Sequence, residues 1–151
     1  MAFSLPRRDG NRPLSIRDLS ISCGVACSEL CIRCNFCGKV LDFIEKVYFD
    51  YACLQLLWKH GYPRACCKVC ARIISTWEFT RFYEDTLNPR EVEDLLGIPF
   101  LQLNIRCYLC LRLLSTFEKA QVEEESGRVH RVRGAWRTKC YWCRGRTIER
   151  S

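Results

Sequence analysis

Four Cys-x-x-Cys pairs recur along the chain with one fixed spacing. They begin at Cys34, Cys67, Cys107 and Cys140, and the chain between the first and second pairs is as long as the chain between the third and fourth. One constant offset, which we call the repeat shift, carries Cys34 onto Cys107 and each other cysteine of the first two pairs onto one of the last two. The repeat shift also aligns the Ile-Arg that precedes Cys34 and Cys107. Such self-similarity indicates an internal duplication.

The repeat separates metal ligands from the other cysteines. Cys31 also forms a Cys-x-x-Cys pair with Cys34, but the repeat shift carries Cys31 onto Asn104 and Cys66 onto Lys139, so neither has a counterpart. We expect Cys31 to be a spare thiol, buried near the first pair. Two pairs per set supply four thiolates, the tetrahedral donor set of a structural zinc site without an open position. We therefore predict two structural zinc ions, one held by Cys34, Cys37, Cys67 and Cys70, the other by Cys107, Cys110, Cys140 and Cys143.

A disulfide scaffold is the alternative reading of the 13 cysteines. Small disulfide-rich proteins are secreted, and secretion requires an apolar signal segment at the N-terminus. Residues 1–20 carry prolines and charges in place of such a run, and no stretch is apolar and long enough to cross a membrane. We therefore expect an intracellular protein without membrane association, whose thiols bind metal.

The segments between the pairs predict the same local structure in both copies. Asp42 and Ser115 are equivalent, and each is followed three residues later by Glu, the capping-box pattern that begins a helix. Alternating apolar residues around Gly134 predict a short hairpin before the last pair. Units this small rarely bury enough apolar surface to fold without a metal or a disulfide. The predicted fold class is therefore α/β, with two duplicated zinc modules joined by a linker helix.

The predicted boundaries follow from the cysteines and the connector. Residues 71–83 predict a helix whose apolar residues cover most of its circumference. Asn88 and Pro89 begin a second helix that Gly97 ends, and residues 100–105 alternate as a strand. The predicted segments are an N-terminal arm at 1–30, zinc module one at 31–71, the linker helix and connector at 72–104, zinc module two at 105–144 and a basic tail at 145–151.

Catalytic chemistry is not supported by the residue types. The two histidines, His60 and His130, occupy non-equivalent positions of the repeat and belong to no triad pattern. The chain also has no glycine-rich phosphate loop. We therefore expect a binding protein and not an enzyme.

Two classes of partner fit the charge distribution. Residues 126–151 hold eight Lys/Arg and one acid, which accounts for the net charge of +7. Aromatic residues are interleaved there and can stack on bases, as in a zinc-dependent nucleic-acid-binding transcription regulator. Alternatively, two modules and an apolar helix form a cleft whose basic rim takes an acidic amphipathic helix. The residues of this basic face are Arg128, Arg131, Arg133, Arg137, Lys139, Arg144, Arg146 and Arg150, with Trp136, Tyr141 and Trp142.

Two such modules, with a connector between Cys70 and Cys107, resemble papillomavirus early protein six, the small viral oncoprotein. The resemblance spans residues 12–143 and is carried by residues 32–37 (IRCNFC), 65–70 (ACCKVC), 105–107 (IRC) and 130–140 (HRVRGAWRTKC). It implies a non-enzymatic adaptor that captures acidic LxxLL helices of host proteins in a groove between the zinc modules and the linker helix. It also implies effects on host transcription, ubiquitination or apoptosis, in the host cytoplasm and nucleus.

The resemblance also implies which residues bind the helix and which host proteins carry it. Mucosal members recruit a HECT-type ubiquitin ligase, whereas cutaneous members bind Mastermind-like Notch coactivators. Ala135 stands where some members place an arginine that pairs with the peptide's acids. We therefore expect a cutaneous or animal type, with a Mastermind-like partner first and a HECT ligase second. By position, the apolar pocket comprises Phe36, Leu54, Cys66, Ala71, Ile74 and Trp77, and the contacts to the helix or its acids come from Arg106 and Arg133.

Three further expectations concern other partners. The C-terminal Glu149-Arg150-Ser151 lacks the features that PDZ domains recognise, so no PDZ partner is expected. The basic face allows a weak contact with nucleic acid. Tyr51 and Leu54 are the candidates for self-association through the first module.

Overall fold

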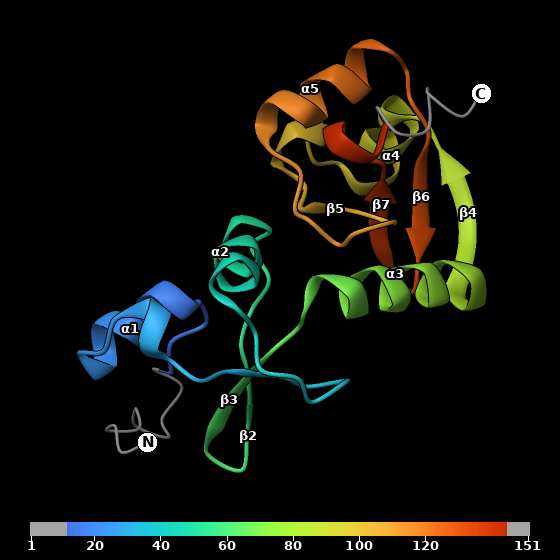
Figure 1. Cartoon of the computed structure of the whole chain (residues 1–151). Coiled ribbons are helices and arrows are strands. Elements are labelled where there is room, and N and C mark those ends of the chain that lie inside the picture. The colour runs from blue at the N-terminus through green and yellow to red at the C-terminus, as the bar shows by residue number, and fades with distance from the viewer. Residues whose placement is uncertain (1–11, 145–151) are drawn as a thin grey trace. The chain divides into compact units, whose positions relative to one another are not determined.

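The computed structural model describes residues 12–144, and Figure 1 traces the whole chain. The expectations for the signal segment, the basic tail and the PDZ motif fall outside the described residues, in part or entirely. The chain divides into two compact units, which meet in sequence between Ala71 and Arg72. No helix of the described residues is both long enough and apolar enough to span a bilayer.

Unit 1 combines a small sheet with helices. Its sheet has the order β1-β3-β2, in which β3 pairs with β1 in parallel and with β2 antiparallel. A single 3-10 turn, η1, connects the first helix to the sheet. The elements are α1 (Ile16–Cys23), η1 (Cys27–Glu29), β1 (Arg33–Cys34), α2 (Phe43–Tyr51), β2 (Leu57–Lys59), β3 (Tyr62–Ala65) and the first turn of α3 (Lys68–Phe82).

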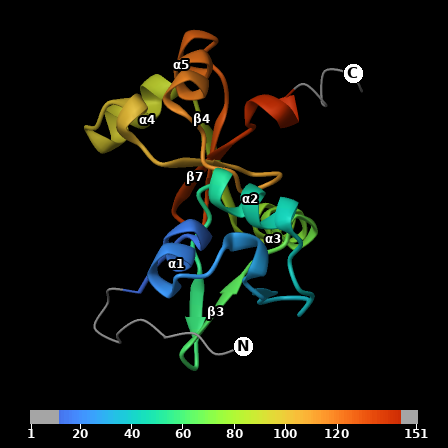
Figure 2. The same ribbon diagram turned by 60° about the vertical axis from the view of Figure 1, so that its left-hand side comes forward.

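Unit 2 contains the rest of α3 and a four-stranded sheet of order β4-β6-β7-β5. The pairs β4–β6 and β6–β7 are antiparallel, whereas β5 and β7 are parallel. In both views α4 and α5 lie toward one end of this sheet and α3 toward the other (Figures 1 and 2). The elements are β4 (Tyr83–Leu87), α4 (Pro89–Leu96), η2 (Phe100–Gln102), β5 (Ile105–Cys107), α5 (Thr116–Glu124), β6 (Val129–Val132) and β7 (Ala135–Thr138).

The duplication extends further upstream than the cysteines. The repeat shift carries α1 onto α4, η1 onto η2, α2 onto α5 and β3 onto β7, with the same bounds in each case. It also relates the residues with positive φ, which fix the turns between these elements. These pairs are Gly24 and Gly97, Gly38 and Leu111, Cys53 and Ser126, His60 and Arg133, and Gly61 and Gly134. Each unit therefore contains a helix, a 3-10 turn and a zinc module that includes a hairpin.

The first helix of each unit is specified by its caps. The Ser15 side chain accepts a hydrogen bond from the Asp18 N–H, and Asn88 forms a capping box with Glu91. Gly24 and Gly97 end the two helices in the left-handed conformation, which glycine adopts without steric cost. The stretch expected as an N-terminal arm therefore contains a capped helix, and α1 packs against α2 as α4 packs against α5.

The core of each unit lies between its helices and its sheet. In unit 1 the largest fully buried side chains include Ile16, Leu19, Ile32, Leu41 and Phe49. In unit 2 one cluster joins the apolar core to the four metal-site cysteines. Its members include Val92, Phe100, Ile105, Val129, Cys107, Cys110, Cys140 and Cys143. Metal binding and core packing are thus continuous in this unit.

Most of the predicted local structure is confirmed. Both capping boxes are present, at Asp42 with Glu45 and at Ser115 with Glu118. The linker helix is α3, and the expected hairpin is formed by β6 and β7 around Gly134. Ile44 lies in α2, the helix that Asp42 caps. It is apolar but 77% exposed, so it lies on the outer face of this helix.

Two predictions are wrong. Residues 100–105 were expected as a strand, but residues 100–102 form η2 and only Ile105 enters β5. Pro99 precedes the 3-10 turn, and Phe100 and Leu103 are both buried at the spacing of a turn. Cys31 was expected to be buried, but it is exposed. Leu30 and Ile32 on either side are buried, and in an extended segment their neighbour faces the opposite side.

Candidate metal centres

Two groups of four cysteines form the candidate metal centres. They are the eight cysteines that the repeat selects: Cys34, Cys37, Cys67 and Cys70 in unit 1, with Cys70 just before its end, and Cys107, Cys110, Cys140 and Cys143 in unit 2. Within each group all four sulfur atoms lie within 4.8 Å of one another. The second group is entirely buried, whereas Cys37 of the first is exposed. The sequence prediction of both ligand sets therefore agrees with the geometry.

Each centre is assembled by a parallel strand pair. In unit 1, β1 runs parallel to β3 and pairs Cys34 with Ala65, so the first cysteine pair lies beside the residues that lead into the second. In unit 2, β5 and β7 pair Cys107 with Thr138 in the same way. The repeat shift relates the two pairings, so both centres have one architecture.

Each first pair sits in a tight turn closed by backbone hydrogen bonds. The Cys34 N–H donates to the Lys39 carbonyl at 2.8 Å, and the Gly38 N–H donates to the Cys34 carbonyl at 3.0 Å. In unit 2 the Cys107 N–H donates to the Arg112 carbonyl and the Leu111 N–H donates back to the Cys107 carbonyl, both at 2.9 Å. These turns hold the two sulfurs of each pair on the same side.

An arginine braces each turn from outside. Arg33 Nη1 donates to the Gly38 carbonyl at 2.9 Å, and Arg106 Nη1 donates to the Leu111 carbonyl at the same distance. Both carbonyls belong to residues with positive φ, where the chain reverses. Arg106, which the resemblance assigns to peptide binding, therefore also has a structural role in its turn.

Backbone N–H groups point at the first sulfur atom of each centre, and at Cys34 they favour its ionised form. The Phe36 and Cys67 N–H groups lie 3.4 Å from the Cys34 sulfur, and the Leu109 N–H lies 3.4 Å from the Cys107 sulfur. Burial raises the pKa of Cys34, but the N–H donors outweigh this effect and lower the pKa to about 6. This centre is therefore prepared to hold a thiolate at Cys34.

The donor set fits Zn²⁺. Four thiolates within contact of one ion give the closed, tetrahedral arrangement of structural zinc, and soft sulfur ligands select against Mg²⁺ and Ca²⁺. With all four positions taken by protein, neither centre has room for a water or a substrate on the metal. The chain thus has two four-cysteine zinc sites whose role is to hold the modules together.

Cys66 lies beside the first centre without belonging to it. Burial and the neighbouring cysteines raise the pKa of the Cys66 thiol to about 12, so this thiol stays protonated at neutral pH. Its thiol donates to the Cys67 carbonyl at 3.4 Å. The repeat excludes Cys66 from the metal ligands, and the protonated state of its thiol agrees with this exclusion.

Each centre has an ion pair beside it, at equivalent positions of the repeat. The two pairs differ in the exposure of their side chains to solvent. Lys39 pairs with Glu45 at 2.8 Å, and the Lys39 side chain is 49% exposed. The equivalent pair in unit 2 is Arg112 with Glu118, whose side chains are 6% and 8% exposed. Glu118 also accepts a hydrogen bond from the Tyr141 N–H at 2.7 Å, within the last cysteine pair. Unit 2 therefore anchors its second cysteine pair through a buried carboxylate.

The residues that the resemblance assigns to peptide binding differ widely in exposure. In unit 1 Phe36 is exposed, Leu54 and Cys66 are half-buried, and Ala71 is buried. In unit 2 Trp77 is 48% exposed and Ile74 is half-buried. The aromatic members are therefore accessible, whereas Ala71 packs within the fold.

Arg133 lies in the turn between β6 and β7 and contacts the end of α3. Its guanidinium lies 3.9 Å from the centre of the Phe82 ring, and it pairs with Glu78 at 3.4 Å. The Phe82 ring contacts Trp77 edge-on at 5.5 Å, and Arg81 lies 5.6 Å from the Trp77 ring. A hollow of about 650 Å³ runs along this helix, lined by Arg72, Ile73, Thr76, Trp77, Thr80 and Arg81.

Within residues 12–144, the basic residues expected to contact nucleic acid do not form a single stacking platform, and Arg146 and Arg150 lie outside the described residues. Arg131 lies over the Trp136 ring at 4.8 Å, and Trp136 itself is 9% exposed. Arg137 lies 3.6 Å from Glu78. Tyr141 and Trp142 are exposed and contact each other edge-on. Several of these side chains are thus engaged within unit 2, which weakens the nucleic-acid hypothesis.

Sequence reasoning missed two features near these centres. The repeat shift carries Lys46 onto Lys119, and both are buried, but the sequence alone gives them no role. Their hydrogen bonds to η1 and η2 could be inferred only once those turns were known. Sequence reasoning also missed a hollow of about 400 Å³ on unit 2, because the residues that line it are scattered from Tyr108 to Arg144.

Comparison with known proteins places these observations in a family. The model of the family described as Early Protein (E6) matches residues 34–143, which include all eight ligands. The chain is 39% identical over 132 residues to Protein E6 of Human papillomavirus type 5b, covering 87% of this chain and 84% of that protein. It is 38% identical over 130 residues to Protein E6 of Human papillomavirus type 1, covering 86% and 93%. These relatives come from cutaneous types.

One solved structure also matches part of the chain. The solution structure of the C-terminal zinc-binding domain of HPV51 oncoprotein E6 aligns with a TM-score of 0.39 and 30% sequence identity. The alignment covers 44% of this chain and 88% of that domain.

Proposed function

The chain belongs to the Early Protein (E6) family of papillomavirus oncoproteins, and from this premise we propose that it is a non-enzymatic adaptor that captures acidic LxxLL helices of host proteins. The observation that carries the proposal is the match of the family model across residues 34–143, through both zinc modules. Closed zinc sites favour a scaffold that presents surfaces over a centre that performs chemistry.

The surface of α3 in unit 2 supports this proposal. Trp77 and Ile73 offer apolar contact to leucine side chains, while Arg72, Arg81 and Arg133 supply positive charge to acidic residues on the flanks. An amphipathic helix binds by laying its apolar face on such a surface, and complementary charge adds specificity. Arg133 already pairs with Glu78, so an acidic peptide would exchange one carboxylate partner for another.

The host partner we propose is a Mastermind-like Notch coactivator, with a HECT ubiquitin ligase as the second candidate. The relatives from cutaneous types support this order. Ala135 offers no cation to the peptide's acids, which also favours the first partner. We place this activity in the host cytoplasm and nucleus. Self-association would use the ring of Tyr51, which is 55% exposed on α2.

The test is the affinity of a labelled acidic LxxLL peptide for the zinc-loaded full chain, measured by fluorescence anisotropy. Arg133→Ala and Leu54→Glu should each weaken binding about tenfold or more, by loss of a charge contact or of an apolar wall. The matched controls are Arg90→Ala and Leu95→Glu on α4, whose side chains are exposed. All four variants should retain two zinc ions.

The outcome that contradicts the proposal is equally definite. If Arg133→Ala and Leu54→Glu bind as the unmodified chain does, the implied peptide site is wrong. If a peptide with its leucines replaced by alanine binds as well as the LxxLL peptide, the interaction is only charge attraction. Raising the salt concentration distinguishes recognition of the leucines from charge attraction, because salt screens charges and weakens binding that depends on charge alone.

A further inference from the structure

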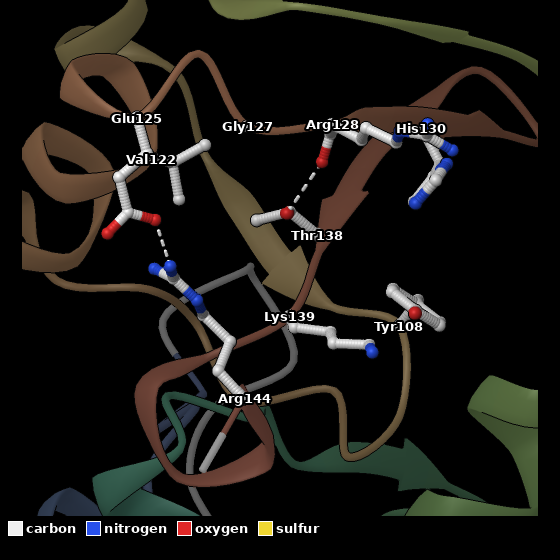
Figure 3. A pocket seen from close by; sticks show the side chains of 9 residues that line it. All are labelled: Tyr108, Val122, Glu125, Gly127, Arg128, His130, Thr138, Lys139 and Arg144. Atoms are coloured by element: carbon white, nitrogen blue, oxygen red, sulfur yellow. Dashed lines mark hydrogen bonds and ion pairs between the residues drawn. The ribbon is translucent and has the colours of Figure 1, made fainter. Parts of the chain in front are cut away.

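A hollow of about 400 Å³ lined by charged side chains lies on unit 2, beside the second zinc site and lined by none of the residues of the α3 hollow. Figure 3 shows the side chains that line it. Three of them are cationic, Arg128, Lys139 and Arg144, and one, Glu125, is anionic. The remaining lining residues are Tyr108, Val122, Gly127, His130 and Thr138. With His130 neutral, the cations outnumber the anion by two, a balance suited to a dianion.

The hollow is built by segments that the zinc site fixes. Tyr108 lies inside the first cysteine pair of unit 2, Lys139 precedes Cys140, and Arg144 follows Cys143. The Arg144 N–H donates to the Cys140 carbonyl at 2.9 Å, which closes the last turn. The metal ligands therefore position these three residues, so the arrangement of the hollow depends on the folded zinc module.

The opposite wall is tied down by local contacts. The Thr138 hydroxyl donates to the Arg128 carbonyl at 2.8 Å, which joins the loop before β6 to the end of β7. Gly127 lies so close to Val122 that a Cβ atom there would approach the Val122 Cγ1 to 3.1 Å. Glu125 pairs with Arg144 across the hollow, as Figure 3 shows. Glu125 thus fixes one cation at the rim.

One ring nitrogen of His130 is engaged by a hydroxyl on the neighbouring strand β4. Its Nδ1 lies 2.8 Å from the Thr86 hydroxyl, which in turn lies 2.5 Å from the Tyr83 hydroxyl. If Tyr83 donates to Thr86 and Thr86 donates to Nδ1, the proton of the neutral ring resides on Nε2. Phe79 and Tyr108 both contact the ring edge-on at 5.2 Å and hold its orientation.

We infer that this hollow binds a phosphate monoester, with Arg128 and Lys139 as the principal charge partners. Arg128 from the loop before β6 and Lys139 from the end of β7 line one recess, which suits a single compact dianion, whereas Arg144 is paired with Glu125. A nucleic-acid backbone, by contrast, needs charges spread along a track. A small phosphorylated molecule and a phosphorylated side chain carry the same group, so both are tested below.

An alternative is that the cations only balance the negative charge of the zinc thiolates. That role is filled in part by Arg112, which pairs with Glu118 and lies beside Cys140. Arg128 lies in the loop before β6, is exposed, and makes no ion pair with a carboxylate among residues 12–144. The two roles predict different results when Arg128 is replaced.

The experiment titrates the ¹⁵N-labelled, zinc-loaded full chain with inorganic phosphate, phosphoserine, adenosine monophosphate and, separately, a phosphoserine peptide and its unphosphorylated form. Amide shifts should change around Arg128, His130 and Lys139 with saturation. Arg128→Ala should weaken binding about tenfold, the loss expected for one charge-assisted contact. Arg90→Ala on α4 removes the same charge from an exposed position outside the hollow and should leave the affinity unchanged.

The outcomes decide the proposal and the source of the phosphate. Tighter binding of the phosphopeptide than of phosphoserine or adenosine monophosphate identifies a phosphorylated side chain as the ligand, and the reverse order identifies a small molecule. The inference is overturned if none of the probes shifts these amides at millimolar concentration, or if Arg128→Ala and Arg90→Ala reduce the affinity equally. It is also overturned if Arg128→Ala loses zinc, which would show a charge-balancing role.

Discussion

Lys46 and Lys119 make the same buried contact in the two units. The Lys46 ammonium donates to the Leu30 carbonyl at 2.8 Å, and the Lys119 ammonium donates to the Leu103 carbonyl at 2.8 Å. Each also donates to a second carbonyl, of Cys27 and Leu101 respectively. Burial lowers the pKa of Lys119. A helix of each zinc module is therefore fastened to the 3-10 turn that precedes the module.

We expect Lys46→Met and Lys119→Met to destabilise their own units by about 1–3 kcal/mol each, because each removes the lysine donor from the carbonyl of a buried leucine, Leu30 or Leu103. Hydrogen exchange of the amides in η1 and η2 measures the effect unit by unit. Lys59→Met is the control, since Lys59 is exposed on β2. Equal losses in all three variants would argue against the fastening role.

The two equivalent ion pairs should differ in energetic value. Glu118→Gln removes the charge from a buried pair and should cost about 3–5 kcal/mol. Glu45→Gln changes the equivalent pair, in which the Lys39 side chain is half exposed, and should cost less than about 1 kcal/mol. Glutamine retains the capping-box hydrogen bonds in both variants. Chemical denaturation of the zinc-loaded variants gives both values, and similar costs would mean that burial of the pair has no effect.

His130 should make unit 2 less stable as the pH falls. Burial, together with Arg128 and Lys139, lowers the pKa of His130 in the folded state below its ordinary value of 6.5. Between these two pKa values the unfolded chain binds more protons, so stability decreases as the pH is lowered through about 6.5 toward the folded pKa.

His130→Gln removes the contribution of His130 to the pH dependence of stability. Protons also compete with zinc for the cysteine ligands, but this effect is the same in the wild type and in the variant. The difference in unfolding free energy between wild type and variant should therefore change with pH in this range. An NMR titration of the ring reports the pKa directly. A midpoint above the ordinary value in the folded chain would contradict the expected sign.

Much of the fold follows from the sequence because the repeat is strict. The eight ligands, the capping boxes at Asp42 and Ser115 and the hairpin at Gly134 all depend on short-range patterns. Extending the repeat shift upstream would have found α1, since Ser15 falls on Asn88 and Gly24 on Gly97, the caps of α4.

The remaining features depend on tertiary contacts that no short pattern encodes. Alternation at residues 100–105 looks like a strand, but Phe100 and Leu103 pack on the core through a 3-10 turn. Residues from several elements line the hollow at His130, so only the folded unit brings them together. Burial of Arg112 with Glu118, against exposure of Lys39, is likewise a property of packing.

Both units depend on two sets of four cysteines, related by the repeat, that each hold one zinc ion. Native mass spectrometry of the intact chain counts these ions. We predict two zinc ions in the unmodified chain and in Cys31→Ser, and one in Cys34→Ser and in Cys140→Ser. Fewer than two in the unmodified folded chain, or loss of an ion from Cys31→Ser, would contradict the account.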